Sequence, residues 1–248
     1  MNEKFTLRIG NHLDTADKKR VYTEQVFSEI APRYDFITRA LSFWRDASWK
    51  QTLITWLPAL DAPVCADLAC GTGDLAFSLA DKYRQANITG LDIAEPMLEL
   101  ARERNIHSHV RFIKGDMASL PFPANTVDIV TGGYALRNAP DLEATITEIH
   151  RILKPGGTAA FLDFSKPRTK KLQYLEYWLL KIWTGFWGIL FHRNHEVYSY
   201  IAESLAKYPS RPELYSLFEK QGFKIMRSQL NFFGITEVLL VRKVTSHG

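Results

Sequence analysis

Carboxylates at the ends of apolar runs are the residues of this chain that could do chemistry. The run Val64–Ala69 contains Asp67 and leads directly into Cys70-Gly71-Thr72-Gly73-Asp74, after which a helix-like pattern begins. The sequence therefore predicts a strand, a tight turn and a helix N-terminus. Gly71 and Gly73 would let the backbone of such a turn approach a nucleotide-like ligand closely.

Two ligands fit this glycine turn, and the flanking acids favour one of them. The stretch from Gly71 to Ala76 matches the dinucleotide pattern G-x-G-x-x-A, and Asp92 follows at about the expected spacing of roughly 20 residues. For NAD, a pyrophosphate at the helix N-terminus would lie beside the carboxylate of Asp74, which is unfavourable. S-adenosylmethionine has no phosphate but carries a cationic amine and a cationic sulfonium, so Asp67 and Asp74 suit it better.

Acids after the second and third predicted strands extend the site. Asp92 can accept hydrogen bonds from both ribose hydroxyls, and Asp116 can accept one from the adenine amine while Met117 packs on the ring. Taken singly, an acid near a strand end is at least as often a helix cap or a solvated turn residue. The combination with the double-glycine turn is what favours S-adenosylmethionine.

The elements that must position these residues alternate between strand and helix. Five strands are predicted first, at Val64–Ala69, Ile88–Leu91, Val110–Ile113, Thr126–Thr131 and Thr158–Phe164. One of the helices between them, Leu142–Leu153, should end at Lys154-Pro155-Gly156-Gly157, where glycine supplies a left-handed cap. Two last strands, Phe223–Leu230 and Ile235–Val241, should form an antiparallel hairpin. This order predicts an α/β fold with a mostly parallel sheet, helices on both faces, and ligands outside the carboxyl ends of the strands.

Helical segments precede and interrupt this alternation. Residues 1–20 are polar and aperiodic, and we expect a mobile leader followed by a single domain over residues 21–248. Residues 21–60 should form an aromatic helical cap, broken at Pro32 and at Asp46-Ala47-Ser48. Residues 172–207 should form a second aromatic helical segment that acts as a lid or insertion.

The second aromatic segment suits a membrane surface. The stretch Tyr174–Phe191 is nearly long enough to span a bilayer, but Glu176 and Lys181 fall inside it, so spanning is not expected. Basic residues flank it on both sides: Lys166, Arg168, Lys170 and Lys171 before, and His192, Arg193 and His195 after. Aromatic rings between basic flanks are typical of peripheral contact at the membrane interface. The same rings could instead line a substrate pocket, and the two interpretations are compatible.

Composition sets the broad class of protein. The chain has 248 residues and a formal net charge of +4, which is too diffuse to predict a nucleic-acid partner. No further residues with metal-ligand spacing accompany Cys65 and Cys70, so we expect buried thiols in a reducing compartment and no metal. The N-terminus carries neither a secretory nor a transit signal, and the expected location is the cytoplasm.

Several motifs resemble those of class I S-adenosylmethionine-dependent methyltransferases: Asp67–Gly73, Gly115-Asp116, Leu120-Pro121-Phe122-Pro123 and Lys154-Pro155-Gly156-Gly157. More narrowly, three blocks are similar to the ubiquinone/menaquinone biosynthesis C-methyltransferase family: Ala31-Pro32-Arg33-Tyr34-Asp35, Leu136-Arg137-Asn138 and Phe164-Ser165-Lys166-Pro167. The likeness runs from about Phe27 to the end of the chain.

This resemblance implies a fold, a cofactor and a reaction. The fold would be Rossmann-like, a seven-stranded sheet that is mostly parallel with an antiparallel last strand. The cofactor would be S-adenosylmethionine, held at Thr72, Asp92, Asp116, Met117 and Gly133. The reaction would be C-methylation of a hydrophobic, prenylated quinol in menaquinone- or ubiquinone-type biosynthesis.

The chain departs from the family pattern in the segment expected to close over cofactor and substrate. Thr38 replaces an Asn, Trp44 a Gly and Ala47 an Arg, although Ser42 and Trp49 are kept. In addition, Ala69 stands where many methyltransferases have the first glycine of the turn. The changes before residue 50 bear on the substrate more than on the fold.

Methyl transfer to a ring carbon requires a stabilised phenolate rather than a nucleophilic triad. Arg137, with Asn138, follows the fourth predicted strand and is the best catalytic candidate. Arginine is too basic for proton abstraction, so it would stabilise the oxyanion or orient a water molecule. Secondary candidates are Tyr34, Asp35 and Asp163, whereas His192 and His195 are expected at exposed or lid positions.

Other functions remain open at this point. The changes at Thr38, Trp44 and Ala47 allow methylation of another hydrophobic small molecule, at oxygen, nitrogen or carbon. The glycine turn alone also allows an NAD-dependent oxidoreductase or a non-catalytic cofactor-binding subunit. A homodimer is compatible with the sequence.

Overall fold

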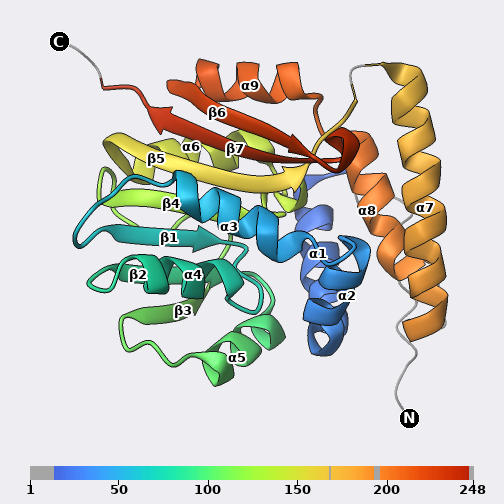
Figure 1. Ribbon diagram of the computed structural model, residues 1–248, viewed down its shortest axis with the longest axis horizontal. Helices are drawn as coiled ribbons and strands as arrows, with labels where there is room; N and C mark the ends of the chain where they lie inside the picture. The colour runs from blue at the N-terminus through green and yellow to red at the C-terminus, as the bar shows by residue number, and fades with distance from the viewer. Residues whose placement is uncertain (1–13, 168, 193–195, 246–248) are drawn as a thin grey trace.

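A seven-stranded sheet forms the centre of the molecule (Figure 1). The computed structural model describes residues 14–167, 169–192 and 196–245. The strand order is β3-β2-β1-β4-β5-β7-β6, and β7 alone runs in the direction opposite to the other six strands. The strands are β1 (Val64–Leu68), β2 (Asn87–Asp92), β3 (Val110–Lys114), β4 (Val127–Gly133), β5 (Leu153–Phe164), β6 (Phe223–Asn231) and β7 (Thr236–Lys243). The predicted sheet and its terminal hairpin are confirmed.

Helices cover both faces of the sheet because its strands present apolar side chains on both sides. Along β5, Ala160 and Leu162 pack with the helices of one face, and Ala159 and Phe161 pack with those of the other. This alternation is the period-2 pattern of a strand that is buried on both faces. The first face carries α3 (Asp46–Trp56), α4 (Asp74–Lys82) and α5 (Glu95–Arg104), and the second carries α6 (Leu142–Ile152) and α9 (Arg211–Lys220).

The remaining helices gather beyond the carboxyl ends of the parallel strands, at the right of Figure 1. They are α1 (Ala16–Ile30), the short 3₁₀ helix η1 (Ala31–Arg33), α2 (Tyr34–Leu41), α7 (Lys170–His192) and α8 (Glu196–Lys207). The two aromatic segments of the sequence meet there. Tyr22 of α1 packs against Tyr200 of α8 with ring centroids 5.5 Å apart, and the hydroxyls of Thr23 and Tyr200 are 3.1 Å apart.

Three predicted boundaries were wrong. Helix α1 begins at Ala16, so residues 16–20 belong to the cap and not to the leader, of which residues 1–13 lie outside the described chain. Asp46-Ala47-Ser48 opens α3; the break precedes it, where Phe43 and Trp44 have positive φ. The glycine cap expected after α6 is absent from this described stretch, since α6 ends at Ile152 with an extended Leu153 that already belongs to β5.

Candidate active site

The turn between β1 and α4 presents bare backbone at the carboxyl end of β1. Gly71 and Gly73 have φ of +53° and +93°, and Gly73 is the N-cap of α4. A Cβ on Gly73 would lie 2.9 Å from the ring of Phe77, so a side chain has no room there. Ala69 also has a positive φ, +49°, which explains why a glycine is common at its position.

Asp92 ties the glycine turn to the end of β2. Its Oδ2 accepts a hydrogen bond from the backbone N–H of Gly71 at 2.8 Å, and its Oδ1 accepts one from Ala94 at 2.9 Å. Burial raises the pKa of this carboxyl group, while the backbone donors oppose the shift. Each carboxylate oxygen keeps a second lone pair, so Asp92 can still accept from ribose hydroxyls.

A cavity opens beside Asp92, and we call it the cofactor cavity. Its wall contains four residues expected to hold the cofactor, namely Gly71, Asp116, Met117 and Gly133, together with Asp92 itself. Asp116 caps its own turn, because its Oδ1 accepts from the backbone N–H of Ala118 at 2.9 Å. The structure therefore brings together residues from the ends of β1, β2, β3 and β4.

A smaller side cavity continues past the glycine turn and contains two more expected residues, Asp67 and Thr72. Oδ1 of Asp67 accepts from the hydroxyl of Thr131 at 2.7 Å, whereas Oδ2 has no hydrogen-bond partner among the described residues. Burial raises the pKa of Asp67 to about 7. Lys50 also lines this cavity, and sequence reasoning missed it; its place directly after Trp49, in the segment expected to close over the ligands, was the available signal.

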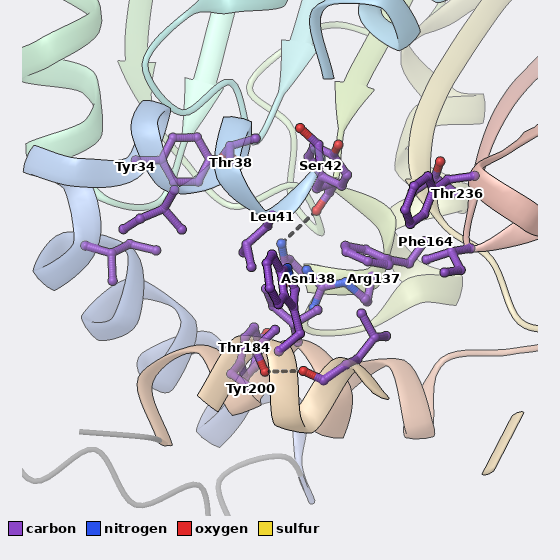
Figure 2. Close-up of a pocket in the computed structure, with 18 of the residues that line it drawn as sticks. Tyr34, Thr38, Leu41, Ser42, Arg137, Asn138, Phe164, Thr184, Tyr200 and Thr236 are labelled. Carbon is purple, nitrogen blue, oxygen red and sulfur yellow. Dashed lines mark hydrogen bonds between the residues drawn. The ribbon is translucent and has the colours of Figure 1, made fainter. Parts of the chain in front are cut away.

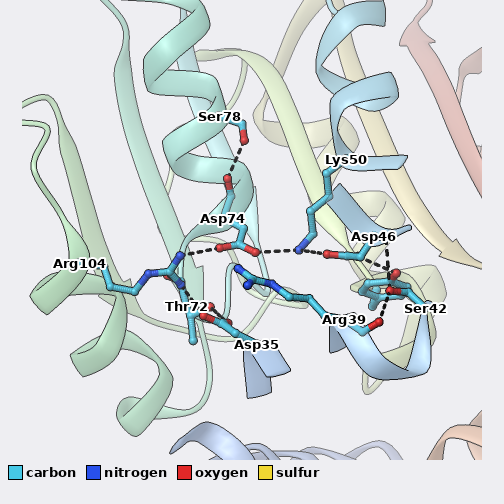
Figure 3. Close-up of polar contacts among 10 residues, drawn as sticks. Asp35, Arg39, Ser42, Asp46, Lys50, Thr72, Asp74, Ser78 and Arg104 are labelled. Carbon is cyan, nitrogen blue, oxygen red and sulfur yellow. Dashed lines mark hydrogen bonds and ion pairs between the residues drawn. The ribbon is translucent and has the colours of Figure 1, made fainter. Parts of the chain in front are cut away.

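Six residues form a polar network that we call the cap clasp: Asp35, Asp46, Lys50, Thr72, Asp74 and Arg104 (Figure 3). Arg104 at the end of α5 pairs with Asp35 at 3.0 Å and with Asp74 at 2.8 Å. The hydroxyl of Thr72 donates to Asp35 at 2.6 Å. The clasp thus joins α2 and α3 of the cap to the glycine turn.

The charge argument drawn from Asp74 is weaker than the sequence indicated. Asp74 is paired with Lys50 at 3.0 Å as well as with Arg104. Although burial acts in the opposite direction, these cations lower the pKa of Asp74. Its negative charge is already compensated, so Asp74 alone does not exclude a phosphate ligand.

A larger apolar cavity lies between the cap, the end of β5 and α7 (Figure 2). With its open mouth it contains about 970 Å³ of space free of protein atoms. Its wall is mostly aliphatic and aromatic, with contributions from Ile37, Leu41, Phe164 and Trp183. Phe27, Tyr34, Tyr134 and Asn138 line both this cavity and the cofactor cavity, so the two are neighbours.

Arg137 is buried in the wall of the apolar cavity, with 3% of its side chain exposed. It lies in the 3₁₀ turn η2 (Leu136–Asn138) that follows β4. Its guanidinium donates to the hydroxyl of Ser204, lies 5.1 Å from the ring centroid of Phe164, and keeps Nε 3.8 Å from Oδ1 of Asp163. Among the described residues, Nε has no hydrogen-bond partner. Arg137 is therefore a buried residue of the cavity wall and not a surface residue.

The turn that carries Arg137 and Asn138 is held from three sides. Oδ2 of Asp163 accepts from the backbone N–H of Arg137 at 3.0 Å. The amide of Asn138 donates to the carbonyl of Tyr134 at 2.7 Å, while its Oδ1 is buried without a described partner. Lys19 of α1 donates to the carbonyl of Arg137 at 3.0 Å and also to that of Ala139. Lys19 was assigned to the leader by sequence, yet it anchors this turn.

The other catalytic candidates are placed differently. Tyr34 lines all three cavities, and burial raises its pKa to about 12. Asp35 turns away towards Thr72 and Arg104 and belongs to the cap clasp. The side chain of His192 and all of His195 lie outside what the structure describes.

The residues present fit S-adenosylmethionine. Bare backbone, three strand-end carboxylates and the buried, unpartnered Oδ2 of Asp67 suit a ligand with ribose hydroxyls and a cationic amine. No group of three or more His, Cys, Asp or Glu side chains that could hold a metal ion occurs in the described ranges.

Comparison with known proteins identifies the family. The profile of the ubiE/COQ5 methyltransferase family matches residues 14–242. The 2-phytyl-1,4-naphtoquinone methyltransferase of Thermosynechococcus vestitus is 35% identical, covering 89% of this chain and 98% of that protein. The demethylmenaquinone methyltransferase of Thermus thermophilus is 36% identical, with coverages of 86% and 97%, and that of Anoxybacillus flavithermus is 31% identical, with coverages of 93% and 98%.

Solved structures agree on the fold. An S-adenosylmethionine-dependent methyltransferase of Thermotoga maritima superposes with a TM-score of 0.64 at 20% identity, covering 89% of this chain and 99% of that one. One from Mesorhizobium loti has a TM-score of 0.58 at 17% identity, with coverages of 79% and 97%. The family assignment decides against the NAD-dependent oxidoreductase that the glycine turn alone left open. This chain belongs to the ubiE/COQ5 methyltransferase family and is an S-adenosylmethionine-dependent methyltransferase.

Proposed function

We propose that this enzyme methylates a ring carbon of a hydrophobic quinol that carries a long prenyl-type tail, as in menaquinone-type biosynthesis. The observation that carries the proposal is the apolar cavity, which shares Tyr34, Tyr134 and Asn138 with the cofactor cavity and has Arg137 in its wall. The names of the relatives support it, because they are methyltransferases of demethylmenaquinone and of 2-phytyl-1,4-naphtoquinone.

The polar groups of the apolar cavity suit a ring with hydroxyl groups. When bound, S-adenosylmethionine supplies an electrophilic methyl group. A quinol carbon becomes nucleophilic when the neighbouring hydroxyl loses its proton to water, and the guanidinium of Arg137 would stabilise the negative charge on that oxygen. After methyl transfer, the hydrogen on the methylated carbon would leave as a proton to water, and S-adenosylhomocysteine would be the other product. Asn138 would orient the ring through its unpartnered Oδ1, which can accept a hydrogen bond from a quinol hydroxyl. Tyr34 would separate the ring from solvent above the glycine turn.

Replacement of Arg137 tests this assignment. We expect Arg137→Ala to lower the rate of methyl transfer about 100- to 1000-fold, since a preorganised donor to a developing oxyanion contributes that much. The measurement is transfer of labelled methyl to a reduced, prenylated naphthoquinone. Arg227→Ala, which removes an exposed arginine on the far strand β6, is the matched control and should keep wild-type activity. Activity of Arg137→Ala close to wild type would remove this residue from the mechanism.

A different hydrophobic acceptor is the second candidate. It is favoured by Thr38, which lines the apolar cavity at a position where the family pattern has an Asn. The same assay separates the two candidates when quinols are compared with simple phenols and amines under identical conditions. Faster transfer to a phenol oxygen or an amine than to any quinol would replace our proposal by the second.

We also propose that the outer face of α7 rests on an anionic membrane surface, from which the tail of the acceptor would enter. Within residues 170–190, where the side chains of this helix are described, nine apolar residues are exposed: Leu172, Tyr174, Leu175, Trp178, Leu179, Ile182, Phe186, Ile189 and Leu190. Lys170 and Lys171 are exposed at its start, where cations would meet anionic headgroups. No helix in the described part of the chain has the length and apolarity needed to cross a bilayer. A second copy of the chain covering the same face, as a homodimer, is the competing occupant.

A further inference from the structure

The apolar cavity has unpaired polar atoms beyond the turn that carries Arg137 and Asn138. Four buried side-chain atoms of its wall have no hydrogen-bond partner among the described residues: Nε of Arg137, Oδ1 of Asn138, Nε1 of Trp183 and Oγ1 of Thr236. The first two are assigned above to one oxygen of the acceptor ring. Trp183 is only partly buried and is held by stacking on Phe43. Thr236, the first residue of β7, is 3% exposed, and its hydroxyl has no role in the fold or in the reaction described so far.

The hydroxyl of Thr236 is costly to the protein unless a ligand binds it. A buried hydroxyl without a partner loses its hydrogen bonds to water, and such groups are uncommon in folded proteins. Valine has nearly the same shape as threonine, suits a β-strand equally well and has no polar atom. The packing of β7 therefore does not explain a threonine at this position, whereas a polar group on a ligand in the cavity would.

Thr236 lies on the side of the apolar cavity away from the cofactor. It pairs with Phe164 in the antiparallel ladder of β5 and β7, and the guanidinium of Arg137 lies 5.1 Å from the ring centroid of Phe164. All three residues line the apolar cavity (Figure 2). Asn138 also lines the cofactor cavity, whereas Thr236 does not. A ring in the apolar cavity would thus have one edge towards the cofactor, near Asn138, and the other edge towards Thr236.

We propose that the hydroxyl of Thr236 binds the second oxygen of the quinol, across the ring from the hydroxyl that faces Arg137 and Asn138. A para-quinol carries its two oxygens on opposite carbons of one ring, so polar contacts at two opposite edges of the cavity are its complement. A hydroxyl can donate or accept, and Thr236 can therefore pair with the quinol oxygen. A phenol with one hydroxyl would leave Thr236 unpaired. Thr236 is accordingly a specificity-determining residue, and the inference rests on the quinol acceptor proposed above.

Binding without turnover tests the role of Thr236 separately from the reaction. The probes are a reduced, prenylated naphthoquinol and the matching naphthol, which keeps the hydroxyl beside the carbon to be methylated and lacks only the second one. Each is titrated into the full-length protein in the presence of S-adenosylhomocysteine. The wild-type protein should bind the quinol about three- to tenfold more tightly than the naphthol, the usual contribution of one neutral hydrogen bond. Equal affinities, with methyl transfer to the quinol intact, would overturn this inference alone; no binding of the quinol would overturn the proposed function with it.

Variants then assign the preference to the hydroxyl of Thr236. Thr236→Val removes the hydroxyl and keeps the shape, so the ratio of the two affinities should fall to about one. Thr236→Ser keeps a hydroxyl and should retain most of the wild-type ratio. Thr158 gives the matched control, because it is also buried but lies at the other end of the paired strands, opposite Arg242. Thr158→Val should keep the wild-type ratio.

The outcomes separate ligand binding from a structural role. If Thr236→Val weakened the binding of quinol and naphthol equally, Thr236 would only shape the cavity wall, and the proposal would be wrong. Without ligand, Thr236→Val should be at least as stable to heat as wild type, because it removes an unpaired buried hydroxyl. A clear fall in melting temperature, or a failure to fold, would show that the hydroxyl is bound within the protein, which would also contradict the proposal.

Discussion

Single residues in this protein adopt backbone conformations that their side chains disfavour. Phe43 and Trp44, between α2 and α3, have φ of +51° and +60°. Left-handed backbone is rare for a bulky residue and costs about 1–2 kcal/mol. Phe43 recovers some of this cost because its ring stacks on Trp183 and on Phe232, each with centroids 5.1 Å apart. Trp44 is 66% exposed and recovers little.

A glycine variant is usually less stable than the alanine variant at the same position, and at position 44 we therefore expect the reverse. Trp44→Gly should be more stable than Trp44→Ala by about 1 kcal/mol, because glycine accepts the left-handed conformation without strain. Urea unfolding followed by circular dichroism measures the difference. Lys207, the last residue of α8, gives the control. There the alanine variant should be more stable than the glycine variant, because the backbone is helical. Equal stabilities at position 44 would show that the backbone there carries no strain.

At the residue scale, the sequence predicted the site residues whose positions follow from the local strand pattern, and missed those whose partners are distant in sequence. Asp92 and Asp116 end apolar runs, so their place at the sheet edge followed from local pattern. Lys50 could not be found in that way, since its partner Asp74 comes from a separate helix and only the packing of α3 on α4 brings them together. The same packing cancels the charge of Asp74, which the sequence presented as free.

At the scale of elements, α7 has two chemically different faces. Its outer face carries exposed apolar residues, including Trp178 and Ile182, whereas Glu176 points inward and is only 6% exposed. The sequence placed Glu176 among the apolar residues without showing which face it occupies, because orientation depends on how α7 packs against α8. The acid that argued against a membrane-spanning helix is therefore absent from the exposed apolar face just described.

Burial of Glu176 makes the stability of the protein depend on pH. Burial raises its pKa to about 8, against an unfolded value of 4.5, and nearby Lys166 only partly opposes this. The folded state therefore keeps a proton that the unfolded state releases, so the contribution of this residue to stability falls as pH rises from about 4.5 to 8. Glu176→Gln should remove this dependence and exceed wild type by on the order of 2 kcal/mol at pH 9.

Urea unfolding at pH 5, 7 and 9 measures the effect. The exposed Glu219 of α9 supplies the control, because Glu219→Gln should follow the wild-type pH profile. A constant difference between Glu176→Gln and wild type across this range would contradict the assignment of the proton to Glu176.

At the same scale, the alternation of strands and helices was predictable, but one junction was not. Lys154-Pro155-Gly156-Gly157 resembles a helix stop, yet Leu153 already pairs with Val127 of β4. Gly156, with a φ of +77°, lies inside β5 next to a register shift between β4 and β5. Sheet pairing with β4, which is not local in sequence, decides this boundary.

At the scale of the whole molecule, the apolar face of α7 lies next to the mouth of the apolar cavity. Trp183 of α7 lines that cavity and stacks on Phe43, and Phe233, which follows the cavity residue Phe232, is fully exposed. If this side rests on lipid, the double variant Ile182→Glu/Phe186→Glu should lose at least about tenfold in binding to anionic vesicles, since two buried apolar side chains are exchanged for charges. Flotation with vesicles containing phosphatidylserine measures the bound fraction.

The control for this experiment lies on the opposite side of the fold. Ile106, which is 87% exposed in the loop between α5 and β3, gives a matched variant, Ile106→Glu, that should bind vesicles as wild type does. Analytical ultracentrifugation tests the alternative that a second copy of the chain covers the apolar face of α7. A wild-type dimer that Ile182→Glu/Phe186→Glu converts to a monomer, together with no flotation, would replace the membrane by a second copy of the chain.

Tyr34 lines the apolar cavity, the cofactor cavity and the side cavity, so its position affects access to all three. The next residue, Asp35, is hydrogen-bonded to Thr72 and paired with Arg104, so a movement of this part of the backbone that displaced Tyr34 would break those contacts. A nucleoside in the cofactor cavity and a methylated product in the apolar cavity would both contact Tyr34, and so would the molecules that replace them. If product release requires Tyr34 to move, contacts that touch no reacting atom would also limit the turnover rate of the enzyme.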